Sequence, residues 1–367
     1  MKALSIGSFD SFWKLALVAA VIAAWSLPIW NVVVNPYQIF KAKYAIGDRY
    51  SSSTTNERFL KVEYLINEAK ASSPNSHEAI TGQINNESAG KKGGGNNLVA
   101  NHDAFIVGSS IMGLVDPALV NRYFPDRRFY NLAFLAAKPD EILATLQVLK
   151  RKGVTIKTMV YGLEPIAFTD IKSYGPAYGL HPETTGESRQ RVLFDYLFAS
   201  SLSDGFSRLV TGISGKPSVR YDIEGTGRYY LERYDREIGQ DHGAFIRKQF
   251  PADAKPVKAP PWIESRFEDF RKLARWLKDE KIEGRFYLNP LHPHVAEAYG
   301  VERLAEFKQK ITESSGVEGV SDCTDLLQGN DVNQRFYDYK HFRPSEAAKV
   351  VGCGLNSRQR FCPTGKR

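Results

Sequence analysis

The feature that most constrains this chain is an uncharged stretch near its N-terminus. No Asp, Glu, Lys or Arg lies between Leu15 and Phe40, and residues 15–34 read LALVAAVIAAWSLPIWNVVV. About 20 apolar residues in a helix, rising about 1.5 Å per residue, cross a hydrocarbon core of about 30 Å. We expect residues 1–14 to be a cytoplasmic stub and residues 15–34 to be an uncleaved transmembrane signal anchor. Tryptophans suited to anchoring the ends of such a span occur at Trp13, Trp25 and Trp30.

Two alternatives to the anchor share the same composition. Lys2 and Lys14 before an apolar run also mark a cleaved secretory signal. The run extends to Val34 without a small-x-small cleavage site, which favours the anchor. A buried core helix is the third interpretation. Pro28 predicts a kink or the end of the regular helix.

The orientation of the apolar segment and the compartment of the domain that follows it need a separate argument. Lys and Arg flank the segment on both sides, so the positive-inside rule leaves its orientation open. Because N-terminal anchors most often leave the following domain outside the cytoplasm, we expect a bacterial inner-membrane protein with a periplasmic domain. The three cysteines show no metal-ligand spacing, and a Cys353–Cys362 bridge is possible in an oxidising compartment.

Composition excludes several classes of protein. The chain has 367 residues, of which 43% are hydrophobic and 25% charged, so neither wholesale disorder nor a coiled-coil rod is expected. Mean hydropathy is −0.35, which excludes a polytopic membrane protein. The net charge of +8 comes without a dense Lys/Arg block. It suits anionic lipid or an acidic polymer as a partner, and we expect no nucleic-acid binding.

The rest of the chain divides into a juxtamembrane region and one large domain. Residues 35–102 contain an amphipathic helix at Asn56–Ala69, followed by a Ser-, Asn- and Gly-rich flexible insert at 71–101. From residue 103 to 355, candidate strands and helices alternate, which predicts an α/β domain with a five-stranded parallel sheet covered on both faces. Residues 356–367 form a tail. The expected strands are 104–107, 128–132, 155–163, 285–288 and 317–320, and the main helices are 139–152, 263–277, 295–313 and 344–355.

An insertion interrupts this alternation at about residues 170–261. It is rich in Tyr, Gly and Arg, and we expect it over the carboxyl edge of the sheet, where ligands bind in such folds. Its aromatic and cationic residues are typical of a groove for an acidic sugar chain, or equally of a solvated helix face. These residues are Tyr229, Tyr230, Arg233 and Tyr234.

Two short motifs carry candidate chemistry. In Phe105-Ile-Val-Gly-Ser-Ser-Ile111 a strand runs directly into two serines, so Ser110 stands at the open edge of the sheet, where a nucleophile can attack. Asp338 and His341 lie three residues apart before the last helix, as a base and its orienting carboxylate do. Taken separately, the first motif is also an ordinary turn with an N-cap serine, and the second a helix cap beside a surface histidine.

Together, the early strand–Gly-Ser-Ser and the late Asp-x-x-His resemble the SGNH (GDSL-like) hydrolase family. The similarity is greatest to its membrane-anchored, extracytoplasmic members, such as alginate O-acetyltransferases and the D-alanyl transfer protein of teichoic acid modification. The resemblance implies a three-layer, flavodoxin-like fold that needs no cofactor or metal. It also implies that Ser110 is the nucleophile, His341 the general base and Asp338 the residue that orients it.

Further site candidates follow from the same comparison. Ser109 occupies the place of the family's Asp. Asn131 and Ala136 lie in the second block, Asn131–Ala137, which lacks the usual glycine of the oxyanion hole. The third block, Tyr161-Gly-Leu-Glu-Pro165, lacks Gly-x-Asn-Asp. After the fourth strand, Asn289 and His292 are candidate substrate contacts. No nearby carboxylate completes a metal site with the local histidines.

We therefore expect an extracytoplasmic serine acyltransferase or esterase that acts on acyl groups of a cell-surface polysaccharide. Its expected partners are that polysaccharide, the lipid bilayer and, by resemblance, a membrane protein that exports the acyl group. The alternative is a catalytically inactive SGNH-like scaffold of a polysaccharide assembly or export complex, favoured by the two altered blocks. A phosphate-binding α/β protein is disfavoured, because no Gly-x-Gly-x-x-Gly or Walker sequence follows the first strand.

Overall fold

A computed structural model describes residues 6–40, 54–72, 101–170, 175–199, 201–316, 320–356 and 360–361. The chain forms two compact units. The first, here called the anchor unit, comprises Met1–Asn56 and Tyr174–Arg220; the second, the sheet unit, comprises Glu57–Ser173 and Tyr221–Arg367. Most of the expected flexible insert at 71–101, and much of the expected tail, lie outside the described residues.

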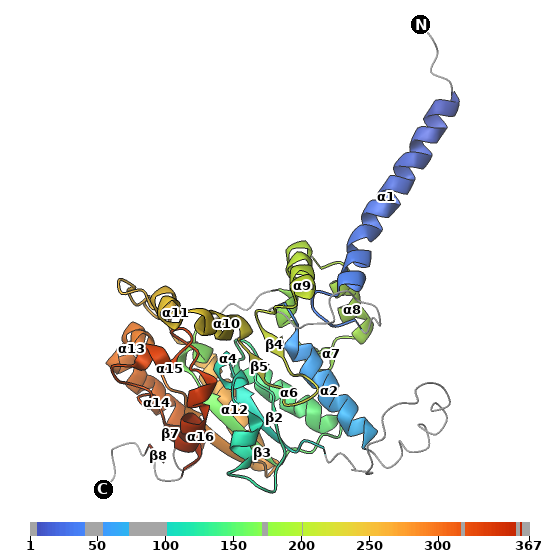
Figure 1. Cartoon of the computed structure of the whole chain (residues 1–367). Coiled ribbons are helices and arrows are strands. Elements are labelled where there is room, and N and C mark those ends of the chain that lie inside the picture. The colour runs from blue at the N-terminus through green and yellow to red at the C-terminus, as the bar shows by residue number, and fades with distance from the viewer. Residues whose placement is uncertain are drawn as a thin grey trace, which may run out of the picture. The chain divides into compact units, whose positions relative to one another are not determined.

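The sheet unit is built on five parallel strands, as the alternating pattern predicted (Figure 1). Their spatial order is β2-β1-β3-β6-β7, and a short β8 pairs antiparallel with β7 at the edge. Residues of β1, β2 and β3 are buried throughout, which is why these strands read as continuous apolar runs. The strands are β1 Ala104–Gly108, β2 Phe129–Asn131, β3 Thr158–Leu163, β6 Glu283–Leu288, β7 Val320–Asp322 and β8 Arg360–Phe361.

Helices cover the sheet on both faces. One apolar cluster joins strand residues to α2 Glu57–Ala71, α6 Pro139–Arg151, α12 Glu264–Asp279 and α14 Val301–Ser315. A second cluster joins the opposite strand side chains to α4 Ser110–Gly113, α5 Pro117–Asn121 and α16 Ala347–Leu355. The three-layer arrangement follows, because each helix buries one apolar stripe against the sheet.

Local signals explain where these helices begin and end. In α6, Pro139 stands in the first turn, with Asp140 and Glu141 beside the positive end of the helix dipole. The single helix expected at 295–313 is in fact two, α13 Pro293–Tyr299 and α14. Gly300 separates them, because its φ of 79° is incompatible with a continuing right-handed helix.

The expected insertion at about 170–261 is divided between the two units at Arg220. Its N-terminal part forms η3 Pro176–Tyr178, α7 Pro182–Thr185, α8 Arg189–Leu197 and α9 Leu202–Ser214. Its C-terminal part forms α10 Glu232–Gln240 and α11 His242–Gln249, with a small sheet, β4 Arg220–Tyr221 and β5 Tyr229–Tyr230, at the division. Shorter segments elsewhere are η2 Pro165–Phe168, α15 Val332–Arg335 and η4 Pro344–Glu346.

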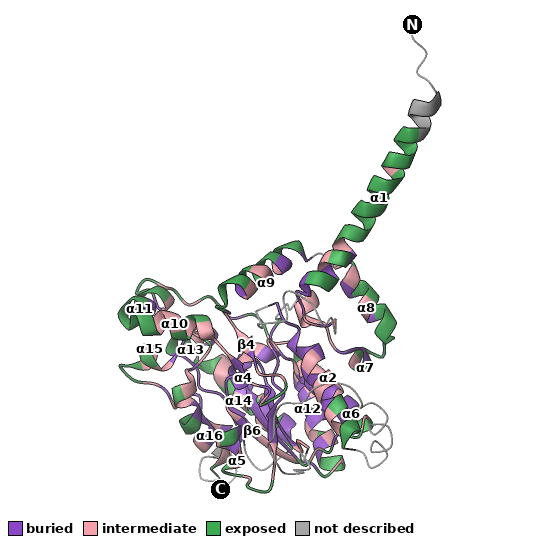
Figure 2. Ribbon diagram, turned by 45° about the vertical axis from the view of Figure 1, so that its right-hand side comes forward, coloured by how far each residue is buried: buried purple, intermediate pink, exposed green. Residues whose placement is uncertain are grey.

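The anchor unit contains α1, Ile6–Val34, whose segment Ser11–Val34 is long and apolar enough to cross a membrane. The sequence predicted a kink or the end of the helix at Pro28; the helix continues through Pro28 to Val34, so an end at this position is wrong. Proline lacks one backbone N–H donor, but the other backbone hydrogen bonds of α1 keep this segment helical. The C-terminal end of α1 packs against α8 and α9 (Figure 2). There the Asn31 amide donates hydrogen bonds to three backbone carbonyls of residues 196–199.

A disulfide joins Cys323 to Cys353, with their Cα atoms 6.1 Å apart. Cys353 therefore pairs differently from the Cys353–Cys362 bridge that the sequence left open, and Cys362 lies outside the described residues. The reason is tertiary: Cys323 follows β7, and α16, which carries Cys353, packs on β7. The bridge closes a loop that contains both Asp338 and His341.

We expect the double substitution Cys323→Ala/Cys353→Ala to destabilise the sheet unit by about 3 kcal/mol, because the bridge restricts the unfolded chain. Thermal unfolding of the detergent-solubilised full chain measures the effect as a lower Tm. Cys362→Ala is the matched control and should leave Tm unchanged. An unaltered Tm in the double variant would mean that the bridge does not form in the protein.

Candidate active site

The candidate site lies where the strand order reverses at the centre of the sheet. β1 pairs with β2 on one side and with β3 on the other, and the chain leaves these central strands towards the same carboxyl edge. Ser110 follows β1 directly, and Glu164 follows β3. Such a reversal opens a crevice in which ligands of doubly wound sheets bind.

Three side chains expected to act together meet at this edge. His341 Nε2 lies 2.8 Å from Ser110 Oγ. On the other side of the ring, His341 Nδ1 lies 2.9 and 3.0 Å from the two carboxylate oxygens of Asp338. This geometry makes Nδ1 the proton donor to Asp338 and leaves Nε2 to accept the serine proton, as a general base must.

The loop that carries Asp338 and His341 is held by its own backbone. An isolated bridge between Phe336 and Phe342 closes it. Asp338 also accepts hydrogen bonds from the backbone N–H groups of Lys340 and His341, at 2.8 and 2.9 Å. Burial alone would raise the pKa of the Asp338 carboxyl, but these bonds and the His341 ring lower that pKa below its ordinary value. Asp338 therefore stays ionised beside the imidazole.

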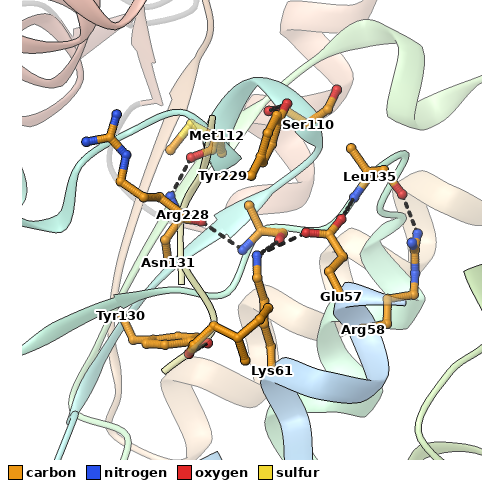
Figure 3. Close-up of polar contacts among 12 residues, drawn as sticks. Glu57, Arg58, Lys61, Ser110, Met112, Tyr130, Asn131, Leu135, Arg228 and Tyr229 are labelled. Atoms are coloured by element: carbon orange, nitrogen blue, oxygen red, sulfur yellow. Dashed lines mark hydrogen bonds and ion pairs between the residues drawn. The ribbon is translucent and has the colours of Figure 1, made fainter. Parts of the chain in front are cut away.

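The turn that presents Ser110 is fixed by close packing and by two side chains. A Cβ at Gly108, whose φ is 141°, would lie 2.6 Å from Met112 Cγ, so only glycine fits there. The Tyr229 hydroxyl donates to the Ser110 carbonyl oxygen. Asn131 donates to the carbonyl oxygens of Met112 and Val115, at 2.7 and 2.8 Å (Figure 3). Asn131 thus supports the nucleophile turn, and Tyr229 is buried beneath it rather than lining a groove.

Ser109 is turned away from the histidine. Its hydroxyl donates to Glu164 Oε1 at 2.6 Å, and the Asn289 amide reaches the same oxygen at 3.4 Å. Ser109, Glu164 and Asn289 are all buried. Because the Ser109 hydroxyl is bonded to Glu164, Ser110 is the serine that contacts His341. Burial raises the pKa of Glu164 to about 7, although the Ser109 hydrogen bond and the charge of His341 oppose the rise. The sequence showed Glu164 only as a departure from the family's third block.

The loop after β2 runs alongside the nucleophile turn. Leu132 N–H donates to the Ile106 carbonyl at 2.8 Å, and Phe134 N–H donates to the Gly108 carbonyl at 3.1 Å. Ala136 adopts a φ of 52°, the left-handed region that favours glycine. Ala136 therefore adopts a glycine-like conformation in this loop.

Buried charges that the sequence did not reveal hold this loop. Glu57, Arg58 and Lys61 of α2 are almost fully buried and point at the loop (Figure 3). Lys61 Nζ donates to the Ala133 carbonyl at 2.5 Å and pairs with Glu57 at 3.2 Å. Glu57 accepts the Leu135 N–H, and Arg58 donates to the Leu135 carbonyl. The available signal was spacing, because Glu57, Lys61 and apolar Leu65 lie four residues apart on one helix face.

A small cavity of about 60 Å³ opens beside the triad. Its walls are mostly apolar, and Glu164 supplies a carboxyl to them. The apolar lining comes from the residue after the nucleophile, from η2, from the segment before α13 and from α13 itself. These residues include Ile111, Pro165, Ile166, Leu291, Val295 and Tyr299.

His292 lines this cavity but is held by protein groups. Its Nδ1 accepts the His294 N–H at 3.2 Å, and its Nε2 lies 2.8 Å from Asn333 Oδ1. The ring stacks on Phe250, and burial lowers the His292 pKa below its ordinary value. His292 is thus a neutral N-cap of α13 in this arrangement. Asn289 differs, since its buried Oδ1 has no hydrogen-bond partner in the described part of the chain.

The described residues contain no group of three His, Cys, Asp or Glu that could hold a metal ion. Comparison with models of known protein families gives no match, and comparison with curated proteins gives none either. The assignment of the site therefore rests on its geometry.

Glu164 makes the stability of the sheet unit depend on pH. A carboxyl whose pKa is raised by folding binds its proton more tightly in the folded chain. Its stabilising effect is therefore full at about pH 4 and is lost as the pH rises to about 7. We expect Glu164→Gln to remove this decline in Tm between pH 4 and 7. Glu297→Gln, at an exposed position of α13, is the control. Parallel pH profiles for wild type and Glu164→Gln would contradict the assignment.

The buried pair Glu57–Lys61 should behave as one unit. Lys61→Met leaves the Glu57 charge buried without its partner, and such losses cost about 3–5 kcal/mol. The double variant Glu57→Gln/Lys61→Met should be less destabilised than the sum of the two single variants. Chemical denaturation of all four proteins measures this coupling. Strict additivity would show that the two charges do not interact.

Proposed function

We propose that this protein is a membrane-anchored serine acyltransferase or esterase that acts on acyl groups of a cell-surface polysaccharide outside the cytoplasm. The observation that carries the proposal is the continuous hydrogen-bonded series from Ser110 through His341 to Asp338. Ser110 attacks the acyl carbonyl and forms an acyl-enzyme, while His341 takes the serine proton. His341 then returns the proton to the leaving alcohol, and Asp338 stabilises the imidazolium that forms between these steps.

The size of the neighbouring cavity favours a short acyl group. The cavity of about 60 Å³ has mostly apolar walls, which suit a group of a few heavy atoms such as an acetyl. One of its wall residues, Ile111, directly follows the nucleophile, and another, Lys340, directly precedes His341, so the cavity borders the segments that carry both residues.

Fold-level observations support the SGNH-like assignment. Among the parallel strands the order is second, first, third, fourth and fifth along the chain, as in flavodoxin-like sheets. The serine follows the first strand, and Asp338 and His341 precede the last described helix, α16. This placement agrees with the resemblance that the two motifs carry. The polysaccharide substrate and a membrane partner that supplies the acyl group rest on that resemblance.

Two features support a location at the outer face of a cytoplasmic membrane. Side chains of α1 from Leu15 to Ile29, apart from Ser26, are apolar and largely exposed, as a lipid-facing helix requires. The Cys323–Cys353 bridge is typical of an oxidising compartment. A domain placed beyond the bilayer and closed by a disulfide fits the periplasm.

We expect a fluorophosphonate probe to label the full chain covalently and Ser110→Ala to lose the labelling, because the probe reacts with a serine activated by its histidine. Ser109→Ala is the matched control and should keep it. Asp338→Asn should slow hydrolysis of an acetyl ester by about 10³–10⁴-fold, by analogy with other triads. Gel fluorescence and a chromogenic acetyl ester provide the measurements.

The same experiment addresses the alternative function. If the folded wild type takes up no probe and does not hydrolyse the ester, the inactive-scaffold interpretation replaces the enzyme. Equal labelling of wild type and Ser110→Ala would assign the nucleophile to a different residue.

A further inference from the structure

Helix α9 of the anchor unit has its polarity reversed. Helices on the surface of a water-soluble domain bury apolar side chains and expose polar ones. In α9 the exposed stripe is apolar: Leu202, Phe206, Val210 and Ile213 are 58%, 61%, 63% and 84% exposed. Their spacing of four, four and three residues places them on one face of the helix.

The opposite face of α9 buries polar groups within the same unit. Arg208 is fully buried and donates to Thr55 Oγ1 at 3.2 Å. Asp204 accepts a hydrogen bond from the Tyr37 hydroxyl at 2.8 Å. Thr211 is also buried. Buried polar groups need specific partners, and these contacts provide them within the unit. The packing of the polar face therefore fixes which face of α9 is exposed.

Helix α8 adds to the apolar surface. Phe194 and Phe198 lie four residues apart, are 57% and 46% exposed, and contact each other with ring centroids 4.8 Å apart. Val192 and Tyr196, on another face of α8, are buried. The exposed side chains of both helices belong to the unit that contains α1. We call these six residues the apolar platform: Phe194, Phe198, Leu202, Phe206, Val210 and Ile213.

The platform is continuous with the end of α1. The Trp30 ring contacts the Phe206 ring, with centroids 5.3 Å apart, and covers Gly205, where a Cβ would lie 2.4 Å from Trp30 Nε1. Just beyond Trp30, Asn31 and Val34 are buried in the unit, whereas Ile29 is exposed. The span Ser11–Val34 has 24 residues and rises about 36 Å, slightly more than the hydrocarbon core of about 30 Å. Trp30 lies about one turn before the end of this span, where tryptophans anchor a helix at the membrane interface.

We propose that the apolar platform of α8 and α9 inserts into the outer interfacial layer of the same bilayer that α1 crosses, so that the anchor unit is held by an interfacial surface as well as by a span. The proposal rests on the proposed anchor. Lipid is the occupant that the observations favour, because the stripe begins at the interfacial tryptophan of α1, and because helices that lie in the interface present an apolar face to the acyl chains. The platform orients the unit and prevents it from turning freely about the axis of α1.

Spin labelling of the full chain in phospholipid vesicles tests this proposal. Single cysteines replace Phe206, Val210 or Ile213 in a Cys362→Ser background that keeps the Cys323–Cys353 bridge. Val21→Cys in α1 is the control within the bilayer, and Val301→Cys, which is 79% exposed in the sheet unit, is the aqueous control. Electron paramagnetic resonance measures collisions of each label with oxygen, which concentrates in lipid, and with a water-soluble nickel complex.

We expect labels at the three platform positions to be several-fold less accessible to nickel, and more accessible to oxygen, than the label at 301. Platform labels as open to nickel as the label at 301, with position 21 still shielded, would overturn the proposal and leave the anchor intact. Platform labels shielded from both reagents would also overturn it, because a protein would then cover the face. If position 21 too is open to nickel, the anchor itself fails. Because the five side chains replaced by cysteine are exposed, circular dichroism should show the same folding as in the Cys362→Ser background.

Discussion

The pairing of β1 with β3 is the interaction on which the rest of the sheet unit depends. The two strands are in register over five residues, from Ala104 opposite Thr158 to Gly108 opposite Gly162. β1 ends at Gly108, which lies opposite Gly162, the penultimate residue of β3, and a Cβ at either glycine would collide with Met112 of the nucleophile turn. The absence of two side chains thus lets that turn pack down on the strand ends. The same ladder brings the residues after each strand to one edge, where the reversal of strand order leaves room for a ligand.

Around this edge the protein buries polar groups, which lowers the free energy of unfolding. Glu164, Lys61 and Glu57 lie in positions where apolar side chains would be easier to accommodate. Each holds a segment that borders the nucleophile: Glu164 holds Ser109, and the α2 residues hold the loop at 133–135. Rigid support of this kind is what a site needs when it must keep reacting atoms within a few tenths of an ångström. The same buried contacts therefore lower the stability of the folded chain and fix the position of the nucleophile.

Much of the sheet and the three triad residues could be predicted, because both depend on local patterns. Buried parallel strands read as short apolar runs, and the carboxyl ends of such strands share one edge, so Ser110 could be placed from its position after β1. The roles of neighbouring residues could not be predicted in the same way. Asn131 and His292 carry suitable groups for binding substrate, yet protein atoms occupy those groups. Which partner a polar side chain meets depends on segments that lie far away in sequence.

By itself the sequence determined the apolar span, the alternation of strands and helices, and the residue types available for acyl chemistry, since each is a property of composition or short-range period. Only the tertiary structure decided which residues meet. It paired Cys353 with Cys323, placed Ser109 against Glu164, and turned the apolar face of α9 outward while Arg208 faced inward. Hydrophobic periodicity shows that a helix has two faces, but which face is covered depends on what packs against it, and that information is not local.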